Sequence, residues 1–289
     1  FKQKTAYEIL SGLVGSEMCI RDRHICSRRE NDSGISTCHC YCFGRFDSNN
    51  HTNKNDKIIQ DRETILKESV LEIQNLSHSY ENGNYILENI DLVAKCGEII
   101  SIIGASGCGK TTLLRIIAGL EKQSGGTVEI NHSIVSDANF STPPENRNIG
   151  LVVQDRALFP HLTIYENVNF GIRNLPSEID IPLEYLKLFK VENLSKKYPH
   201  EISGGEQQRV ALARSMAPNP DILLLDEPFN ALDKQLKTEL HNETKKIFRK
   251  KNSTVIIVSH DIEEAKFFSD KIYKMKNGQL AEKSIMTKS

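Results

Sequence analysis

Residues 104–112 read Gly104-Ala105-Ser106-Gly107-Cys108-Gly109-Lys110-Thr111-Thr112, and this stretch decides the fold of the 289-residue chain. An apolar strand, 98–103, precedes it, and an apolar helix, 110–118, follows it and ends at Gly119. Glycines let the backbone wrap around a phosphate without Cβ clashes, while successive N–H groups and the helix N-terminus face the anion. The order strand, glycine-rich loop and helix therefore predicts a phosphate-binding loop in an α/β domain.

A second motif supplies the carboxylates that phosphate chemistry needs. The buried strand 222–225 ends in Asp226, Glu227 and Pro228. With the phosphate loop upstream, we expect Lys110 to reach the β- and γ-phosphates, and we expect Thr111 and Asp226 to hold Mg²⁺. Glu227 is then expected to polarise the attacking water. Without the phosphate loop, two solvated carboxylates at a strand end would be the better interpretation.

A third motif is Ser203-Gly204-Gly205-Glu206-Gln207-Gln208-Arg209, which precedes the apolar run 210–213. Small residues at a helix start leave free N–H donors that point outward. A simple N-cap at Ser203 explains the string equally well when it is considered alone.

These three motifs, followed by Val258-Ser259-His260-Asp261, resemble in their order and spacing the ATP-binding cassette of ABC transporters. The resemblance covers about 70–282. It implies an α/β P-loop NTPase fold: an ABC-type nucleotide-binding domain with a RecA-like core, an antiparallel β subdomain and a helical signature subdomain. The expected boundaries are a disordered or non-native extension at 1–69, the cassette at 70–283 with its helical subdomain at about 155–217, and a tail at 284–289.

The resemblance also assigns roles to residues. Catalytic roles fall to Glu227 and His260, the latter as the switch histidine on the γ-phosphate. Metal contacts fall to Thr111, Gln154 and Asp226. Nucleotide contacts fall to Tyr80 (stacking on adenine), Gly104, Ala105, Ser106, Gly107, Cys108, Gly109, Lys110, Thr111, Thr112, Gln154, Ser203, Gly204, Gly205, Glu206 and Asp233. The chain departs from the family pattern at Ile202, Glu206 and Asn230, where Leu, Gln and Ser are usual, and this puts the strength of the contact to a partner subunit in doubt.

The implied function is the ATPase subunit of an ABC importer, with ATP and Mg²⁺ as cofactors. The implied partners are a second cassette in a homodimer or paired arrangement, integral membrane permease subunits and, indirectly, a substrate-binding protein. The implied location is peripheral, on the cytoplasmic face of the inner membrane. The stretch 155–168 resembles the importer group for ferric iron, polyamines, sulfate and sugars, and Leu158-Phe159-Pro160-His161 is most similar to ferric-iron importers.

The alternative is a soluble ABC ATPase that acts in DNA repair or translation. DNA-repair ATPases of this kind carry a long insert between the phosphate loop and the signature motif, which begins at Ser203 in this chain. Lys110 and Ser203 are too close in the sequence for such an insert. Ribosomal relatives carry two cassettes, and only one is visible here. A catalytically inactive subunit is disfavoured because Lys110, Asp226, Glu227 and His260 are all intact.

The amino-acid composition further limits the class of protein to which the chain can belong. The chain has 37 Lys and Arg against 38 Asp and Glu, so general attraction to nucleic acid is not expected. Its aliphatic runs are far shorter than the roughly 18 residues of a membrane span, and the start does not read as a signal peptide. Seven cysteines, an odd number, favour reduced thiols in a cytosol.

The N-terminal stretch differs in character from the rest. The cluster Cys38-His39-Cys40-Tyr41-Cys42 lacks the paired spacing of structural zinc sites. Residues 1–23 resemble translated sequencing-adapter DNA, so no functional role is expected of them.

Hydrophobic periodicity predicts further elements beyond the motifs. Strands are expected at 71–76, 85–92, 127–130, 149–153, 254–258 and 271–275, and helices at 181–190, 205–216, 233–251 and 262–268. Residues 276–279, Lys-Asn-Gly-Gln, predict a hairpin turn.

Overall fold

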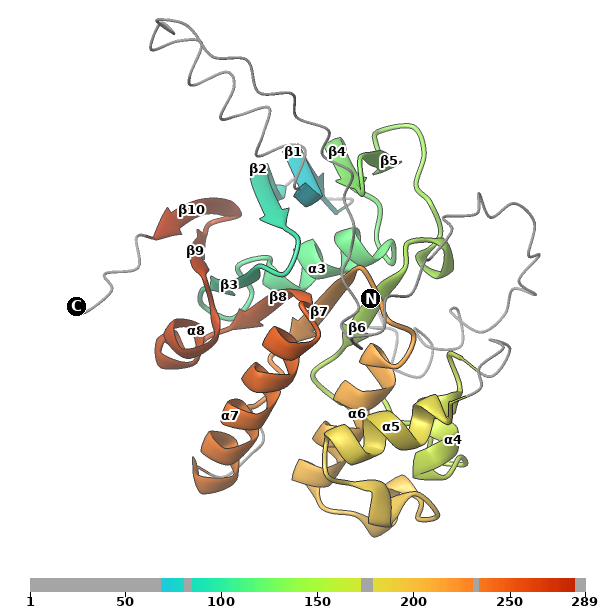
Figure 1. Cartoon of the computed structure of the whole chain (residues 1–289). Coiled ribbons are helices and arrows are strands. Elements are labelled where there is room, and N and C mark those ends of the chain that lie inside the picture. The colour runs from blue at the N-terminus through green and yellow to red at the C-terminus, as the bar shows by residue number, and fades with distance from the viewer. Residues whose placement is uncertain (1–68, 81–84, 173–178, 231–233, 284–289) are drawn as a thin grey trace, which may run out of the picture.

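The computed structural model describes residues 69–80, 85–172, 179–230 and 234–283 (Figure 1). The predictions for the N-terminal extension, including the cysteine cluster and the resemblance of residues 1–23 to adapter DNA, lie outside these residues. So do Asp233 and the C-terminal tail.

A six-stranded sheet forms the centre of the domain, in the order β10-β9-β3-β8-β7-β6. β3 pairs in parallel with β8 and β9, β7 pairs in parallel with β6 and β8, and β10 is antiparallel to β9. The strands are β3 (Ile99–Ile103), β6 (Ile149–Val152), β7 (Ile222–Asp226), β8 (Thr254–Ser259), β9 (Lys271–Lys276) and β10 (Gln279–Lys283). Because β3, β7 and β8 run in parallel, the loops that follow them leave the same edge of the sheet.

A second, antiparallel sheet of four strands has the order β2-β1-β4-β5. Its strands are β1 (Ser69–Ser79), β2 (Tyr85–Lys95), β4 (Gly125–Ile130) and β5 (Ser133–Ser136). Alternate residues of β1 are buried, as expected for a sheet with one covered face. The sheet thus corresponds to the predicted antiparallel subdomain.

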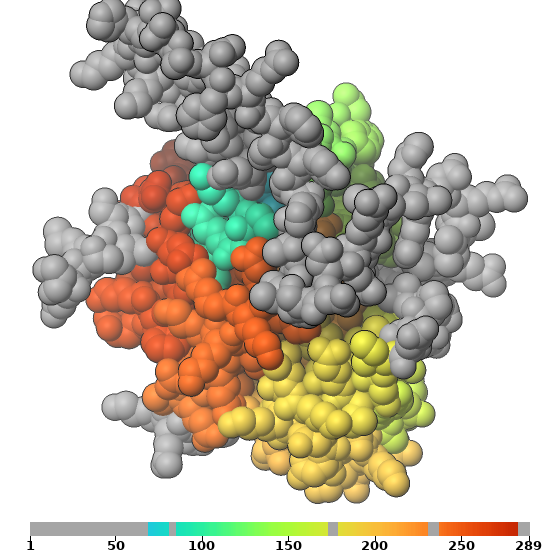
Figure 2. Space-filling model, in the orientation of Figure 1, coloured from blue at the N-terminus to red at the C-terminus, as the bar shows by residue number. Residues whose placement is uncertain are grey.

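The helices are α3 (Lys110–Ala118), α4 (Ile164–Asn169), α5 (Ile181–Leu188), α6 (Gly204–Met216), α7 (Lys234–Lys250) and α8 (Ile262–Phe268), with short 3₁₀ turns at η1 (Pro144–Asn146), η2 (Glu192–Leu194) and η3 (Pro199–Glu201). In Figure 1, α4, α5 and α6 form a group of their own beside the sheet. Figure 2 shows α5, in yellow, and α7, in orange, side by side on one face of the molecule. The ion pairs Lys190–Glu243 and Lys251–Glu184 connect this helical group to α7.

Two hydrophobic cores lie on opposite faces of the central sheet. Ile99, Leu223 and Val255 belong to a core shared with α6 and α7, while Ile100, Leu224 and Ile256 belong to a core shared with α3 and the antiparallel sheet. Both faces of the sheet are therefore covered, which explains why its central strands are continuous apolar runs.

Arg147 anchors the C-terminal end of α3. The residue is 2% exposed, and its guanidinium donates to the carbonyls of Ile116 and Ile117 at 2.8 and 2.9 Å. It also donates to the carbonyls of Thr142 and Val135 and to the hydroxyl of Ser141. Burial lowers the pKa of Arg147 to about 10, so the side chain is still charged at neutral pH. One buried cation thereby joins the helix after the phosphate loop to the edge of the antiparallel sheet.

The predicted fold class is confirmed, and the differences are in short elements. β5 and α4 were not predicted, β1 begins at Ser69, and α6 begins at Gly204 rather than Gly205. The predicted turn joins β9 to β10, with Asn277 and Gly278 at φ values of 49° and 77°. No helix among the described residues is long and apolar enough to cross a membrane. Those residues also contain no cluster of three or more His, Cys, Asp or Glu side chains suited to a metal.

Candidate functional site

The glycine-rich loop lies between β3 and α3, as predicted. Gly107 and Gly109 have φ values of 79° and 105°, which a residue with a side chain rarely adopts. A Cβ atom on Gly109 would lie 2.8 Å from Leu87 Cδ2 and 3.0 Å from the Ile86 carbonyl oxygen. Lys110 is 5% exposed, and its Nζ donates to the carbonyl oxygens of Gly104 and Ala105 at 2.9 and 3.0 Å. The loop is therefore closed around the ammonium group of Lys110.

The first turn of α3 differs from those of two other helices. α4 and α6 begin with capping boxes: the N–H groups of Glu166 and Glu206 donate to the hydroxyls of Thr163 and Ser203, and each glutamate carboxylate accepts from the N–H of its capping residue. α3 has Gly109 at its N-cap, no side-chain cap and no acidic residue in the first turn. Because first-turn N–H groups lack partners within the helix, the start of α3 offers its donors to an anion from outside.

Asp226 is the last residue of β7, next to this helix. It is 7% exposed, and its carboxylate is hydrogen-bonded to the side chain of Thr111. Burial raises the pKa of Asp226, and Glu227 adds to the rise, while the hydrogen bond from Thr111 and the charges of Lys110 and Arg115 oppose it. A carboxylate and a hydroxyl placed together are oxygen ligands of the kind that Mg²⁺ prefers. These two residues therefore fit the predicted metal site.

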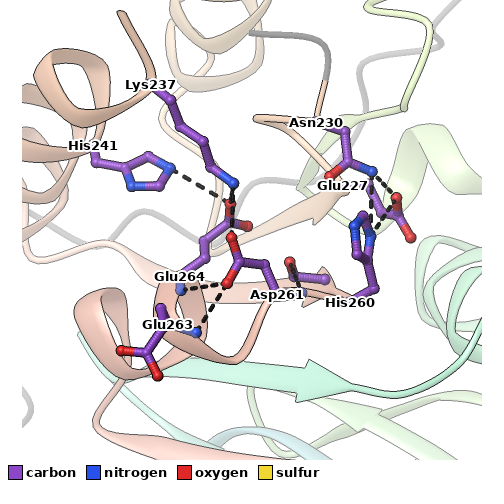
Figure 3. Close-up of polar contacts among 9 residues, drawn as sticks. Glu227, Asn230, Lys237, His241, His260, Asp261, Glu263 and Glu264 are labelled. Carbon is purple, nitrogen blue, oxygen red and sulfur yellow. Dashed lines mark hydrogen bonds and ion pairs between the residues drawn. The ribbon is translucent and has the colours of Figure 1, made fainter. Parts of the chain in front are cut away.

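Glu227 follows β7 in a strained conformation, with φ of 47°. Its N–H donates to the Val258 carbonyl at 3.0 Å, and its Oε2 lies 3.3 Å from His260 Nδ1. Asn230 Nδ2 donates to the same carboxylate oxygen and lies 3.5 Å from His260 Nδ1. Backbone strain of this kind collects at functional sites. The structure thus brings together Glu227 and His260, the two predicted catalytic residues (Figure 3).

Ser203 caps α6, in agreement with the simpler of the two interpretations offered for its motif. Its N–H and hydroxyl donate to Glu206 Oε2 at 2.8 and 2.7 Å, and these hydrogen bonds lower the pKa of Glu206. A Cβ on Gly204 would lie 3.2 Å from the guanidinium of Arg156. The buried residues of α6 belong to the α6–α7 core, whereas those of α3 belong to the opposite core. The helix that the motif opens therefore packs on the face of the central sheet opposite to α3.

The remaining predicted residues lie around this centre. Tyr80, at the end of β1, is 46% exposed and contacts His78 edge to face, with ring centroids 4.8 Å apart. Gln154 is exposed just after β6. Ala105, Ser106 and Thr111 are exposed on the loop and α3, and Cys108 and Thr112 are half-buried. Asp233 lies outside the described residues.

The sequence analysis did not anticipate two features of the site. Asn230 was noted only as a departure from the family pattern, whereas its amide contacts both Glu227 and His260. Lys237, on α7, pairs with Asp261 and Glu264 behind His260. For Asn230, the three-residue spacing from Glu227 was a signal that could have been used. For Lys237, no pattern in the neighbouring sequence indicates that it pairs with Asp261 and Glu264.

Comparisons with known proteins show which family the chain belongs to. A family profile described as "ABC transporter" matches residues 87–230. The Fe(3+) ions import ATP-binding protein FbpC 2 of Haemophilus influenzae is 39% identical over 220 residues, which are 75% of this chain and 62% of that protein. The spermidine/putrescine import ATP-binding protein PotA of Mannheimia succiniciproducens is 42% identical over 220 residues, or 75% of this chain and 58% of that protein. The chain thus spans about three fifths of the length of these curated relatives.

Solved structures extend the comparison. The dimeric, post-hydrolysis state of the ATP-binding cassette MJ0796, bound to ADP and Pi, matches with a TM-score of 0.65 and 35% identity, covering 74% of this chain and 98% of that one. The structure of cbiO1 from Clostridium perfringens, part of the ABC transporter complex cbiONQ, matches with a TM-score of 0.67 and 29% identity, covering 74% and 87%. The family profile and the nearly complete coverage of a 35% identical cassette together show that this chain belongs to the ABC transporter family.

Proposed function

We propose that the chain is the ATP-hydrolysing subunit of an ABC importer and that it uses Mg²⁺ and a separate membrane permease. One observation carries the proposal. The phosphate loop after β3, Asp226 and Glu227 at the end of β7, and His260 after β8 all lie at one edge of the central sheet. That edge is where open α/β sheets bind their ligands.

The roles of the residues follow from their positions. Lys110 and the first-turn N–H groups of α3 bind and neutralise the phosphates, and Thr111 and Asp226 would hold the metal, which would supply positive charge beside the phosphates. Glu227 accepts a proton from the attacking water, because its carboxylate is held by His260 and Asn230 at the end of the strand. Tyr80 and Gln154 complete the nucleotide site at its edges.

The signature residues Ser203, Gly204, Gly205 and Glu206 are proposed to act on a second cassette. The helix that they open packs on the face of the sheet opposite to α3, and the matching MJ0796 cassette is dimeric. In a head-to-tail pair, the start of α6 and Asp233 would face the nucleotide of the partner. Hydrolysis would then require closure of the dimer, and closure couples ATP use to transport. A substrate-binding protein would act through the permease, at the far side of the membrane.

Ferric iron is the proposed cargo, and the proposed location is the cytoplasmic face of the inner membrane. The choice rests on the resemblance of residues 158–161 to ferric-iron importers; relatives named as Fe(3+) ions import proteins, from Haemophilus influenzae and Fusobacterium nucleatum, are 39% and 42% identical, and relatives named as spermidine/putrescine import proteins reach the same identity. We also propose the domain limits predicted above: the cassette at 70–283 with a helical subdomain at about 155–217.

Substitution of Glu227 by Gln tests the function, because the amide keeps the shape of the side chain but cannot accept the proton. We expect the variant to bind Mg²⁺-ATP, to dimerise on gel filtration and to hydrolyse ATP about 10²-fold more slowly, the usual size of a general-base effect. Asp226→Asn should weaken Mg²⁺-ATP binding instead.

Glu263→Gln serves as the matched control, because its side chain is exposed on α8 and pairs with Lys266. Its turnover should equal that of the wild type. Wild-type turnover in Glu227→Gln would contradict the role of this residue. Recovery of ribosomes rather than a permease in a pull-down of the full chain would instead favour the alternative of a soluble ATPase.

A further inference from the structure

Lys237 contacts two carboxylates in an ionic cluster that lies beside His260 (Figure 3). Its Nζ lies 3.0 Å from Asp261 Oδ2 and 3.0 Å from Glu264 Oε2. The two carboxylates belong to the start of α8, while Lys237 belongs to the first turn of α7. The lysine therefore fastens one helix to the N-terminal end of another.

Asp261 directly follows His260 and takes part in four hydrogen bonds. Its N–H donates to Ser259 Oγ at 3.0 Å, and its Oδ1 accepts from the N–H groups of Glu263 and Glu264 at 2.9 and 3.3 Å. Its second oxygen, Oδ2, accepts from Lys237. The backbone that carries His260 is therefore held in place by a helix cap, and the cap is held by Lys237.

The cluster is shielded from water on the side of Glu264, whose side chain is 2% exposed. His241 Nε2 lies 3.5 Å from its carboxylate, and the His241 ring packs against Phe229, Phe267 and Phe268. The side chain of Lys237 is 21% exposed. Ion pairs in such surroundings are screened less than surface pairs, and loss of one partner leaves a buried charge without compensation.

The His260 ring, in contrast, has little packing to hold it, since its side chain is 56% exposed. Its orientation depends on the backbone behind it and on the polar contacts to Glu227 and Asn230 in front. A shift of the His260 backbone therefore directly changes the distance between His260 Nδ1 and the Glu227 carboxylate.

We propose that Lys237 is a positioning residue for ATP hydrolysis: it holds Asp261 and Glu264 and thereby keeps His260 against Glu227. This inference rests on the proposed function. Because a misplacement of about 1 Å in a catalytic group can cost up to about 10²-fold in rate, we expect Lys237→Met to lower kcat roughly tenfold and to leave KM nearly unchanged. Lys237→Arg, which keeps the charge, should restore most of the rate.

A double-mutant cycle separates positioning from a general structural effect. In a chain that already carries His260→Ala, Lys237→Met should cause no further loss of kcat, because its effect passes through His260. Independent, multiplying losses would overturn the proposal. Asp261→Asn keeps the side-chain oxygen that caps α8 but removes the ion pair, so it should reproduce Lys237→Met if the latter fails to fold.

Lys266→Met is the matched control, because Lys266 pairs with Glu263 at 2.8 Å on the exposed face of α8. Its kcat should equal that of the wild type.

A readout without turnover completes the test. In ¹⁵N-histidine-labelled protein without nucleotide, we expect the ring signals of His260, identified by their loss in His260→Ala, to change in Lys237→Met and to return in Lys237→Arg. Unchanged ring signals in Lys237→Met would overturn the proposal, whatever the kinetics. If the wild-type chain hydrolyses no ATP, the proposed function is wrong, and this measurement alone decides whether Lys237 positions His260.

Discussion

Arg147→Met should strongly destabilise the domain, because it removes the donor of five hydrogen bonds. The methionine fills much of the same volume but leaves buried carbonyl oxygens at the end of α3 without partners. Each such group costs about 1–3 kcal/mol, although the losses do not add fully. Because several of these carbonyl oxygens lose their donor together, we expect a loss of free energy of unfolding of about 3–5 kcal/mol.

The assay is thermal unfolding followed by circular dichroism. For a domain of this size, 1 kcal/mol corresponds to a shift of roughly 2–4 °C, so Tm should fall by about 6–20 °C. Arg249→Met is the control: Arg249 pairs with Asp270 at 2.5 Å, its side chain is 42% exposed, and its replacement should cost at most about 1 kcal/mol. If the Tm of Arg147→Met lies within 2 °C of the wild-type value, the loss of free energy of unfolding is below roughly 1 kcal/mol, and the anchoring role is refuted.

Three further changes test the site and its surroundings. Gly109→Ala should weaken binding of a fluorescent ATP analogue at least about tenfold, because φ of 105° and the contact with Leu87 both oppose a side chain there; unchanged affinity would contradict the steric constraint on this turn. Burial raises the pKa of Glu264, but the polar contacts of its carboxylate with His241 and Lys237 outweigh it and hold the pKa below its ordinary value. Glu264 therefore stabilises the fold above its unfolded pKa, and this stabilisation is lost as pH falls through the folded pKa. The free energy of unfolding, measured in urea, should decrease less between pH 7 and pH 4 for Glu264→Gln than for the wild type. Maleimide labelling of the half-buried Cys108 should block ATP binding, and ATP should slow the labelling, as mass spectrometry can measure.

The sequence was sufficient for the parts of the fold that depend on neighbouring residues. The phosphate loop, the carboxylates after β7 and the turn at Asn277 and Gly278 are local patterns, so their positions were predicted correctly. α4 was missed because its six residues are too few for a helical period to emerge, although Thr163 and Glu166 form a capping box.

Long-range contacts could not be predicted in this way. Arg147 binds carbonyls from α3, β5 and the segment at residue 142, which come together only in the folded chain. A single arginine in a loop carries no sign of such partners, since surface arginines are far more common. The same holds for Lys237, whose two carboxylate partners lie 24 and 27 residues away along the chain (261 − 237 and 264 − 237).

The contact of Lys110 with its own loop has a consequence for how affinities should be interpreted. The ammonium group already donates to the Gly104 and Ala105 carbonyls. A nucleotide would therefore exchange one set of acceptors for another instead of meeting a bare cation, and the measured affinity would report only the difference between the two sets. Replacement of Lys110 by an apolar residue would deprive both states of a partner. The nucleotide-free loop would also lose its hydrogen bonds to the lysine. The measured loss of affinity would therefore be smaller than the contribution of the lysine to phosphate binding.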